Sequence, residues 1–331
     1  MSNRQTNALT RDDAAVRKER LYRYLLGGCA TLTLLVTVGI ILALITRAVS
    51  FFSAVSPIAY LTGTEWSPLI GEAAYGVLPL ISGTLIVTVV AGVIALPVGL
   101  AIAIYLSEYA SPRVRSILKP TLEILAAVPT VIYGYFALVH ITPLFDGILP
   151  LSFTILPAGI PVLPEFTFVV PGLRTFNALS AGVVVGLIII PMVSSISEDA
   201  ISSVPDSLRN AAYGLGSTKF DVSTKVVVPA ATSGIVSSYV LAISRAIGET
   251  MAVVIAAGAS PKMPYFPNVL QNLTDSIQTM TSAMVQIAGA ESRTGVLLDS
   301  MFALGLTLFA MTLLMNIFAE AVRRHFREEY N

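Results

Sequence analysis

Charged residues are scarce in this chain of 331 residues: they make up 12% of it, against 55% apolar residues. A soluble domain usually carries about 25% charged residues, so too little polar surface is present to cover a water-soluble protein. The composition excludes a cytosolic enzyme, a nucleic-acid binder and a disordered chain. Together with a mean hydropathy of +0.79, it predicts an all-α integral membrane protein that crosses the bilayer several times.

Residues for disulfides, metal binding and catalysis are few. The single cysteine, Cys29, cannot form a disulfide within the chain, and the histidines, His140 and His325, lack metal-ligand spacing. No lysine follows a glycine, so the chain has no P-loop, and the motifs Gly-x-Ser-x-Gly and His-Glu-x-x-His do not occur. We therefore expect no enzyme, no metal site and no cofactor held by this chain.

Six apolar segments are long enough to cross the hydrocarbon core, which takes about 20 helical residues. They lie at residues 25–46, 80–106, 120–142, 176–197, 226–258 and 299–321. We expect a tail at 1–23, a first transmembrane helix with an outside loop at 24–76, a core at 77–322 and a second tail at 323–331. The loop at 198–225 separates the fourth span from the fifth.

The basic residues set the orientation, because positive charge near span ends prefers the cytoplasmic side. Fifteen of the 20 basic residues fall on one face if the chain crosses six times, and four fall on the other. Both termini are then cytoplasmic, and Arg245 alone lies inside a span. The apolar run after the N-terminal charges exceeds the roughly 7–15 residues of a secretory signal, so we expect an uncleaved anchor in the plasma (inner) membrane.

The loop between the fourth and fifth spans predicts a short amphipathic helix. Asp206 or Ser207 can cap it after Pro205, and Gly216 can end it. Its apolar positions share one face, since they recur at helical spacing. They are Leu208, Ala211, Ala212 and Leu215.

This loop resembles the cytoplasmic sequence of ABC importer permeases, which reads Glu-Ala-Ala, three residues, Gly, nine residues and Ile-x-Leu-Pro. Asn210, Ala211 and Ala212 match its start with Asn in place of Glu, and nine residues separate Gly216 from Val226-Val-Val-Pro229. The resemblance implies the type I ABC importer permease fold and a coupling helix that docks on an ATP-binding subunit. An ordinary surface helix between two spans is the alternative.

Span five carries Arg245 and Glu249, one helical turn apart and able to pair. Charges at this depth are costly, and Arg245 lies 16 residues past Pro229, or about 24 Å along a helix. The residues around them are mostly small: Gly234, Ser238, Leu241, Ala242, Gly248 and Ala252. Arginine binds phosphate-like oxyanions through its planar fork, so one interpretation is an anion site on a translocation path. The other is a self-neutralising pair that fixes two helices, and the residues alone leave both open.

The segment Arg245-Ala-Ile-Gly-Glu249-Thr250-Met-Ala resembles the C-type permease of the high-affinity phosphate importer, whose A-type partner usually has Ala-Pro after Gly-Glu-Thr. Segments near Trp66, Pro129 and Gly305 are similar to the same family, so the resemblance covers most of residues 65–316. It implies phosphate import through Arg245, Glu249 and Thr250.

The same resemblance implies the partners of the chain. They are an A-type permease in a heterodimer, a dimer of ATP-binding subunits that holds ATP and Mg, an extracytoplasmic phosphate-binding protein and the lipid bilayer, with no nucleic acid. Two alternatives stay open: an importer of another oxyanion or solute, and an ion-coupled secondary transporter.

Glu123 lies near the start of span three. We expect its negative charge to stabilise the N-terminus of a helix there.

Overall fold

The computed structural model describes residues 13–69, 71–149, 151–154, 167–170, 172–266, 269–291 and 294–325. In that part of the chain, four helices are long and apolar enough to cross a membrane. They are α1 (Asp13–Ala54), α3 (Leu78–Ile104), α7 (Ala178–Ser202) and α15 (Gly295–His325). Two bent helix pairs bring the number of spans to six if each pair crosses once, which confirms the predicted membrane fold.

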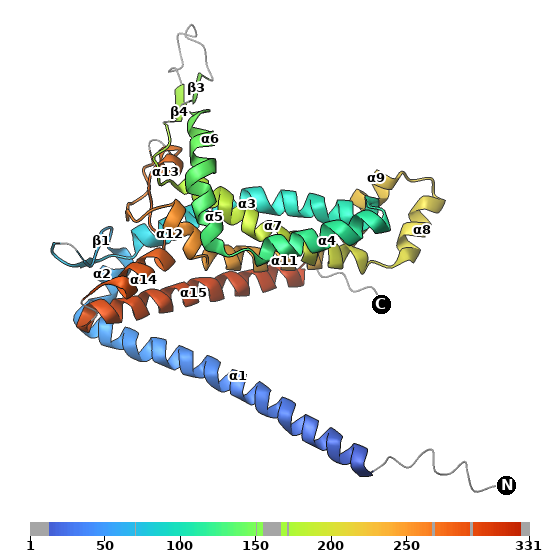
Figure 1. Cartoon of the computed structure of the whole chain (residues 1–331), viewed down its shortest axis with the longest axis horizontal. Coiled ribbons are helices and arrows are strands. Elements are labelled where there is room, and N and C mark those ends of the chain that lie inside the picture. The colour runs from blue at the N-terminus through green and yellow to red at the C-terminus, as the bar shows by residue number, and fades with distance from the viewer. Residues whose placement is uncertain are drawn as a thin grey trace.

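The most buried helix of the bundle is α7, which packs along α3 and shares the main apolar core with it (Figure 1). Asn177 caps α7 by accepting a hydrogen bond from the backbone N–H of Ser180 (2.7 Å). Glycines permit the close approach: a Cβ on Gly182 would lie 2.5 Å from Val90, and one on Gly99 would lie 2.6 Å from Val193. Small residues thus let the two backbones meet, as is common between membrane helices.

The third predicted span is not one helix. It consists of α4 (Pro112–Ala127) followed by α5 (Thr130–Phe136), the π-helical segment η3 (Ala137–Ile141) and α6 (Thr142–Asp146). The chain bends by 88° between α4 and α5. The break falls at Pro129, because Val128 adopts an extended conformation before the proline ring.

The fifth predicted span is also broken. Helix α9 (Lys219–Asp221), the π-helical segment η4 (Val222–Val227) and α10 (Val228–Ala230) precede a bend of 70°, after which α11 (Thr232–Ile247) begins. A second break at Gly248–Thr250 separates α11 from α12 (Met251–Ala256). Pro229, which has no N–H to donate, lies just before the first break.

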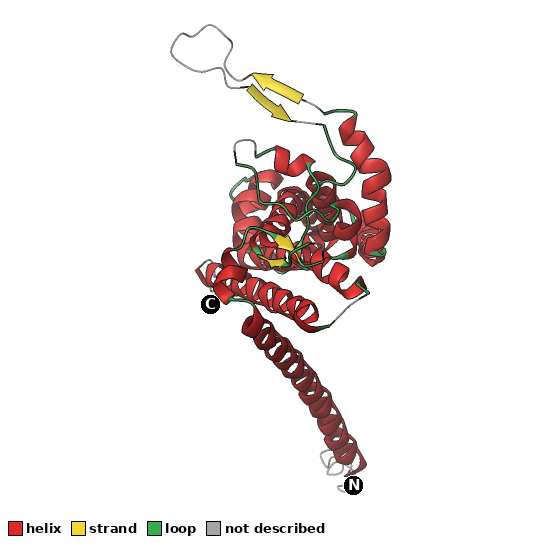
Figure 2. Ribbon diagram, turned by 90° about the vertical axis from the view of Figure 1, so that its left-hand side faces the viewer, coloured by secondary structure: helices red, strands yellow, loops and turns green. Residues whose placement is uncertain are grey.

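Short elements connect the spans. The π-helical segment η2 (Tyr105–Tyr109) extends α3, α8 (Asp206–Gly214) follows α7, and α2 (Pro57–Thr62), α13 (Gln271–Thr274) and α14 (Met280–Gly289) lie at the other end of the bundle. Two antiparallel hairpins pair β1 (Trp66–Ser67) with β2 (Ala74–Tyr75), and β3 (Leu151–Thr154) with β4 (Thr167–Val170). Figure 2 shows the second hairpin standing away from the helices.

Helix α1 diverges from the bundle, and none of its most apolar window is buried within the chain (Figure 1). It contacts α15 near its C-terminal end, where Ser50 donates a hydrogen bond to Asp299 (2.8 Å) and Arg47 pairs with the same carboxylate (3.6 Å). The first turn of α1 and the last turn of α15 both point toward the end of the molecule that holds α8. The tails outside 13–325, and the middle of the proline-rich segment at 142–174, lie beyond the described residues.

Candidate functional site

Arg245 lies in the last turn of α11 and lines a cavity of about 450 Å³ between α4, α7 and α11. The side chain is exposed, and no ion pair or hydrogen bond joins it to another described residue. Four charged side chains line the cavity: Lys119, Glu123, Glu198 and Arg245. An adjoining cavity of about 470 Å³ shares Lys119 and Glu123 and continues past Arg115 and Ser116. The two cavities thus lie on either side of Lys119 and Glu123, one lined by Arg245 and the other by residues at the start of α4.

Glu249 and Thr250 lie in the break between α11 and α12. The Glu249 carboxylate is buried and accepts hydrogen bonds from the backbone N–H groups of Thr250 (3.1 Å) and Ala252 (3.5 Å) at the start of α12. Thr281 of α14 donates to the carbonyl of Glu249 (2.8 Å) and fixes the break. The pair of Arg245 with Glu249, one of the two interpretations left open, is not formed, because the helix ends at Ile247 and the carboxylate accepts from backbone N–H groups instead.

The small residues of α11 pack against α7. The hydroxyls of Ser238 and Ser197 lie 2.7 Å apart, Ala242 is fully buried, and a Cβ on Gly234 would lie 2.4 Å from Ala200. At these three positions the face serves close helix packing. Arg245 lies on the same face of α11, 11 residues after Gly234 and three after Ala242, and there it lines the cavity beside α7.

The predicted amphipathic helix is present as α8, between Pro205 and Leu215. It ends in a Schellman motif: the N–H of Ser217 donates to the carbonyl of Ala212 (3.2 Å) and that of Gly216 donates to Tyr213 (2.9 Å). Gly216 has φ of +83°, a conformation that favours glycine. The predicted side-chain cap at Asp206 or Ser207 is wrong, because the N-cap position is Pro205, which has no capping side chain.

The faces of α8 differ from the simple prediction. Ala212 is buried and Leu208 is half-buried against the protein, whereas Asn210 and Ala211 are exposed and Leu215 is 88% exposed. Tyr213 and Phe220 also expose much of their rings nearby (41% and 65%). The end of the molecule at α8 therefore presents apolar side chains that nothing in the described chain covers.

The loop after α8 is held by local contacts. Thr218 accepts a hydrogen bond from the N–H of Asp221 (3.2 Å), and Lys225 pairs with the Asp221 carboxylate (2.6 Å). The hydrogen bonds from Lys225 and Thr218 hold the pKa of Asp221 below its ordinary value. Pro229 follows in α10, directly before the 70° bend into α11.

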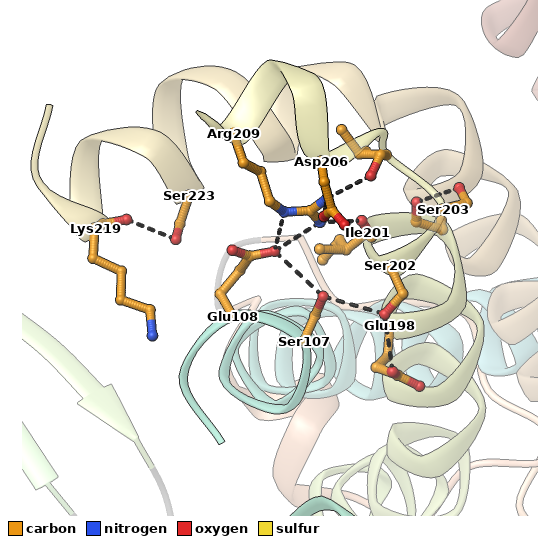
Figure 3. A network of polar contacts seen from close by, with 12 residues as sticks. Ser107, Glu108, Glu198, Ile201, Ser202, Ser203, Asp206, Arg209, Lys219 and Ser223 are labelled. Carbon is orange, nitrogen blue, oxygen red and sulfur yellow. Dashed lines mark hydrogen bonds and ion pairs between the residues drawn. The ribbon is translucent and has the colours of Figure 1, made fainter. Parts of the chain in front are cut away.

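An arginine ties α8 to the helix that precedes α4. Arg209 of α8 donates to the Glu108 carboxylate of η2 from Nη2 (2.9 Å) and Nε (3.2 Å), and the Glu108 side chain is almost fully buried (Figure 3). Arg209 also donates to the carbonyls of Ile201 (2.9 Å) and Val204, where α7 ends. These bonds connect α8 to the ends of α3 and α7.

A second ionic cluster joins α4 to α7. Glu198 is fully buried and pairs with Arg115 and with Lys119 (2.7 Å), while Lys119 also contacts Asp199 (3.0 Å). The hydroxyls of Ser107 and Ser202 (3.3 Å) connect this cluster to η2, as Figure 3 shows. A buried carboxylate requires such partners, because leaving it unpaired in a low dielectric is costly.

Sequence reasoning missed both ionic groups and misplaced Glu123. The basic residues of α4 were expected only to mark orientation, although a carboxylate at the end of a long apolar run, such as Glu198, indicates a need for a cationic partner. Glu123 is not at a helix N-terminus, because α4 already begins at Pro112 behind the capping hydroxyl of Ser111. It lines the cavity instead.

Comparison with known proteins identifies the family. The pattern of the binding-protein-dependent transport system inner membrane components matches residues 95–328, which include α4, α7, α8 and α11. The chain belongs to this family of membrane permeases. The fold agrees: a bacterial alginate ABC transporter structure has a TM-score of 0.59 at 14% identity, over 93% of this chain and 95% of that one. The inward-facing MetNI methionine ABC transporter gives 0.52 at 16% identity, over 76% and 95%.

Curated relatives of this permease are similar over most of their length. The probable ABC transporter permease protein YqgH of Bacillus subtilis is 32% identical, over 88% of this chain and 86% of the relative. The phosphate transport system permease protein PstC of Haemophilus influenzae is 34% identical over 78% of each. PstC of Mesorhizobium japonicum is 29% identical over 92% and 90%. The resemblance to ABC importer permeases is thus confirmed, and the chain is a multi-pass inner membrane component of a binding-protein-dependent transport system.

Proposed function

We propose that this permease is the C-type subunit of a phosphate importer and moves inorganic phosphate across the plasma membrane into the cytoplasm. The observation that carries the proposal is the position of Arg245: it lines a cavity between spans and has no carboxylate partner among the described residues. An unpaired guanidinium in such a cavity offers its planar donor fork to an oxyanion. The relatives named as phosphate permeases support the choice of anion.

Besides this chain, the proposed complex has three kinds of component. An A-type permease completes the pore, a dimer of ATP-binding subunits supplies ATP hydrolysis, and a phosphate-binding protein delivers substrate outside. This chain contributes no ATPase site and no cofactor of its own. Both termini are cytoplasmic, which agrees with the ends of α1 and α15 lying on the same side as α8.

Helix α8 is the proposed docking element for the ATP-binding subunits. Its exposed residues Asn210 and Leu215 face outward, while Ala212 anchors it to the permease. Because Arg209 bonds to Glu108 and to the end of α7, closure of the ATP-binding subunits would move α8 and the spans behind it as one body. That movement would open and close the way to Arg245.

Arg245→Gln tests the proposal in the reconstituted complex with labelled phosphate and the binding protein. Each charge-assisted hydrogen bond contributes about 1.5–3 kcal/mol, so loss of a two-bond fork should lower uptake at least about 100-fold. The complex should still assemble, because the side chain is exposed and packs no core.

Arg113→Gln is the matched control, since Arg113 is an exposed arginine of the first turn of α4 and lines neither cavity. It should transport normally. Normal phosphate uptake by Arg245→Gln would refute the role of Arg245 in binding the transported anion. Uptake that survives without the ATP-binding subunits would favour a secondary transporter, and stronger competition by molybdate or a phosphonate would favour another substrate.

A further inference from the structure

The cavity that Arg245 lines is also lined by a carboxylate that has no partner among the described residues. Of its four charged residues, Lys119 and Glu198 bond to each other at 2.7 Å. Lys119 additionally contacts Asp199, and Glu198 additionally contacts Arg115, so the charges of this pair are satisfied locally. The other two charged side chains that line the cavity are Arg245 and Glu123.

Glu123 is exposed and forms no ion pair or hydrogen bond with any residue in the described part of the chain. It projects from α4, whereas Arg245 projects from α11, so the cavity has a donor fork and an acceptor on different helices. A cavity built only to attract anions has no use for an acceptor. A carboxylate repels every ionised oxygen and is matched only by a ligand that brings a hydrogen to donate.

This requirement separates oxyanions by chemistry. Inorganic phosphate and arsenate near neutral pH keep at least one O–H group, whereas sulfate keeps none. An O–H can donate to Glu123 while the ionised oxygens accept from Arg245. Sulfate can satisfy Arg245 only by placing an ionised oxygen near the carboxylate, which leaves the acceptor unmatched.

We propose that Glu123 determines specificity in this permease by accepting a hydrogen bond from the protonated oxygen of the anion held by Arg245, so that hydrogen-bearing oxyanions are bound and sulfate is rejected. The inference rests on the proposed function and adds Glu123 as a second residue that contacts the anion. A site that bonds to a ligand hydroxyl rejects the analogue without it by about 10⁴–10⁵-fold when fully buried. Glu123 is exposed to the cavity, so a smaller ratio of about 10–100-fold is expected.

The test is calorimetric binding of phosphate, arsenate and sulfate to the assembled permease complex without the binding protein, at constant ionic strength. The wild type should bind phosphate and arsenate similarly and sulfate at least about 10-fold more weakly. Glu123→Gln keeps the size of the side chain and supplies an N–H donor, so sulfate binding should rise to within about 3-fold of phosphate binding. Glu123→Asp should keep the preference in the same direction.

Glu72→Gln is the control for net charge, because Glu72 is exposed in the loop between β1 and β2 and lines neither cavity. It should leave every affinity unchanged. A phosphate-to-sulfate ratio in Glu123→Gln equal to that of the wild type would overturn the inference while leaving the role of Arg245 intact. Phosphate binding that is unaffected by Arg245→Gln would overturn the proposed function instead.

Discussion

At the scale of single residues, two charged side chains differ in their surroundings. Glu198 is fully buried and has two cationic partners, whereas Arg245 faces a cavity and has none within the described chain. A buried, fully paired carboxylate stabilises the contact between helices, because removing one partner exposes the full desolvation cost of the others. An unpaired arginine at a cavity stabilises nothing in the empty protein and is therefore available to a ligand.

Glu198→Gln should lower thermal stability without removing phosphate binding. The amide cannot neutralise Arg115 and Lys119, but both cations are partly exposed, so a loss of about 1–3 kcal/mol is expected. Asp199→Asn is the neighbouring control: that side chain is 66% exposed, and its pair with Lys119 should contribute at most about 1 kcal/mol. Thermal unfolding in detergent compares them, and equal losses for both variants would contradict the structural role of Glu198.

At the scale of elements, breaks in helices determine where polar groups lie. The end of α11 at Ile247 releases Glu249 from the helical register and lets it accept hydrogen bonds from the first N–H groups of α12. The Schellman motif after α8 likewise sets the direction in which the chain leaves the helix. In both places a glycine, Gly248 or Gly216, lies at the break.

Replacement of Gly216 should uncouple ATP hydrolysis from transport. A Cβ at position 216 would have no atom within 4 Å, so a larger side chain causes no steric clash. The substitution costs only backbone strain, about 1–2 kcal/mol for an ordinary residue held at φ of +83°. Gly216→Val should therefore redirect α8, lowering phosphate uptake per ATP hydrolysed in proteoliposomes. Gly216→Asn should stay close to the wild type, because asparagine adopts this conformation more readily. Unchanged coupling in the valine variant would count against α8 as the docking element.

At the scale of the whole molecule, composition predicted the membrane fold because long apolar runs have few other stable arrangements. Pro205 and Gly216 likewise predicted the bounds of α8, since both act locally. The pairing of Arg245 with Glu249 failed because helical spacing assumes an unbroken helix. The ionic partners of Glu198 lie 79 and 83 residues away, and local periodicity contains no information about such contacts.

The orientation of the molecule can be tested with the chain's own cysteine. Cys29 is on the uncovered part of α1, so a bilayer should shield it from a charged maleimide on either side until the protein is denatured. In a Cys29→Ser background, Lys18→Cys should react only from the cytoplasmic side and Lys262→Cys only from outside. Reaction of both from the same side would refute the six-span arrangement.

The contact of α1 with α15 has a consequence for biosynthesis. Ser50 and its partner Asp299 are 249 residues apart in the chain. At about 5–20 residues per second, the ribosome takes roughly 12–50 s to make the second partner after the first. During that interval Arg47 has no Asp299 to pair with. The contact that joins α1 to α15 is therefore among the last long-range contacts of the chain to form.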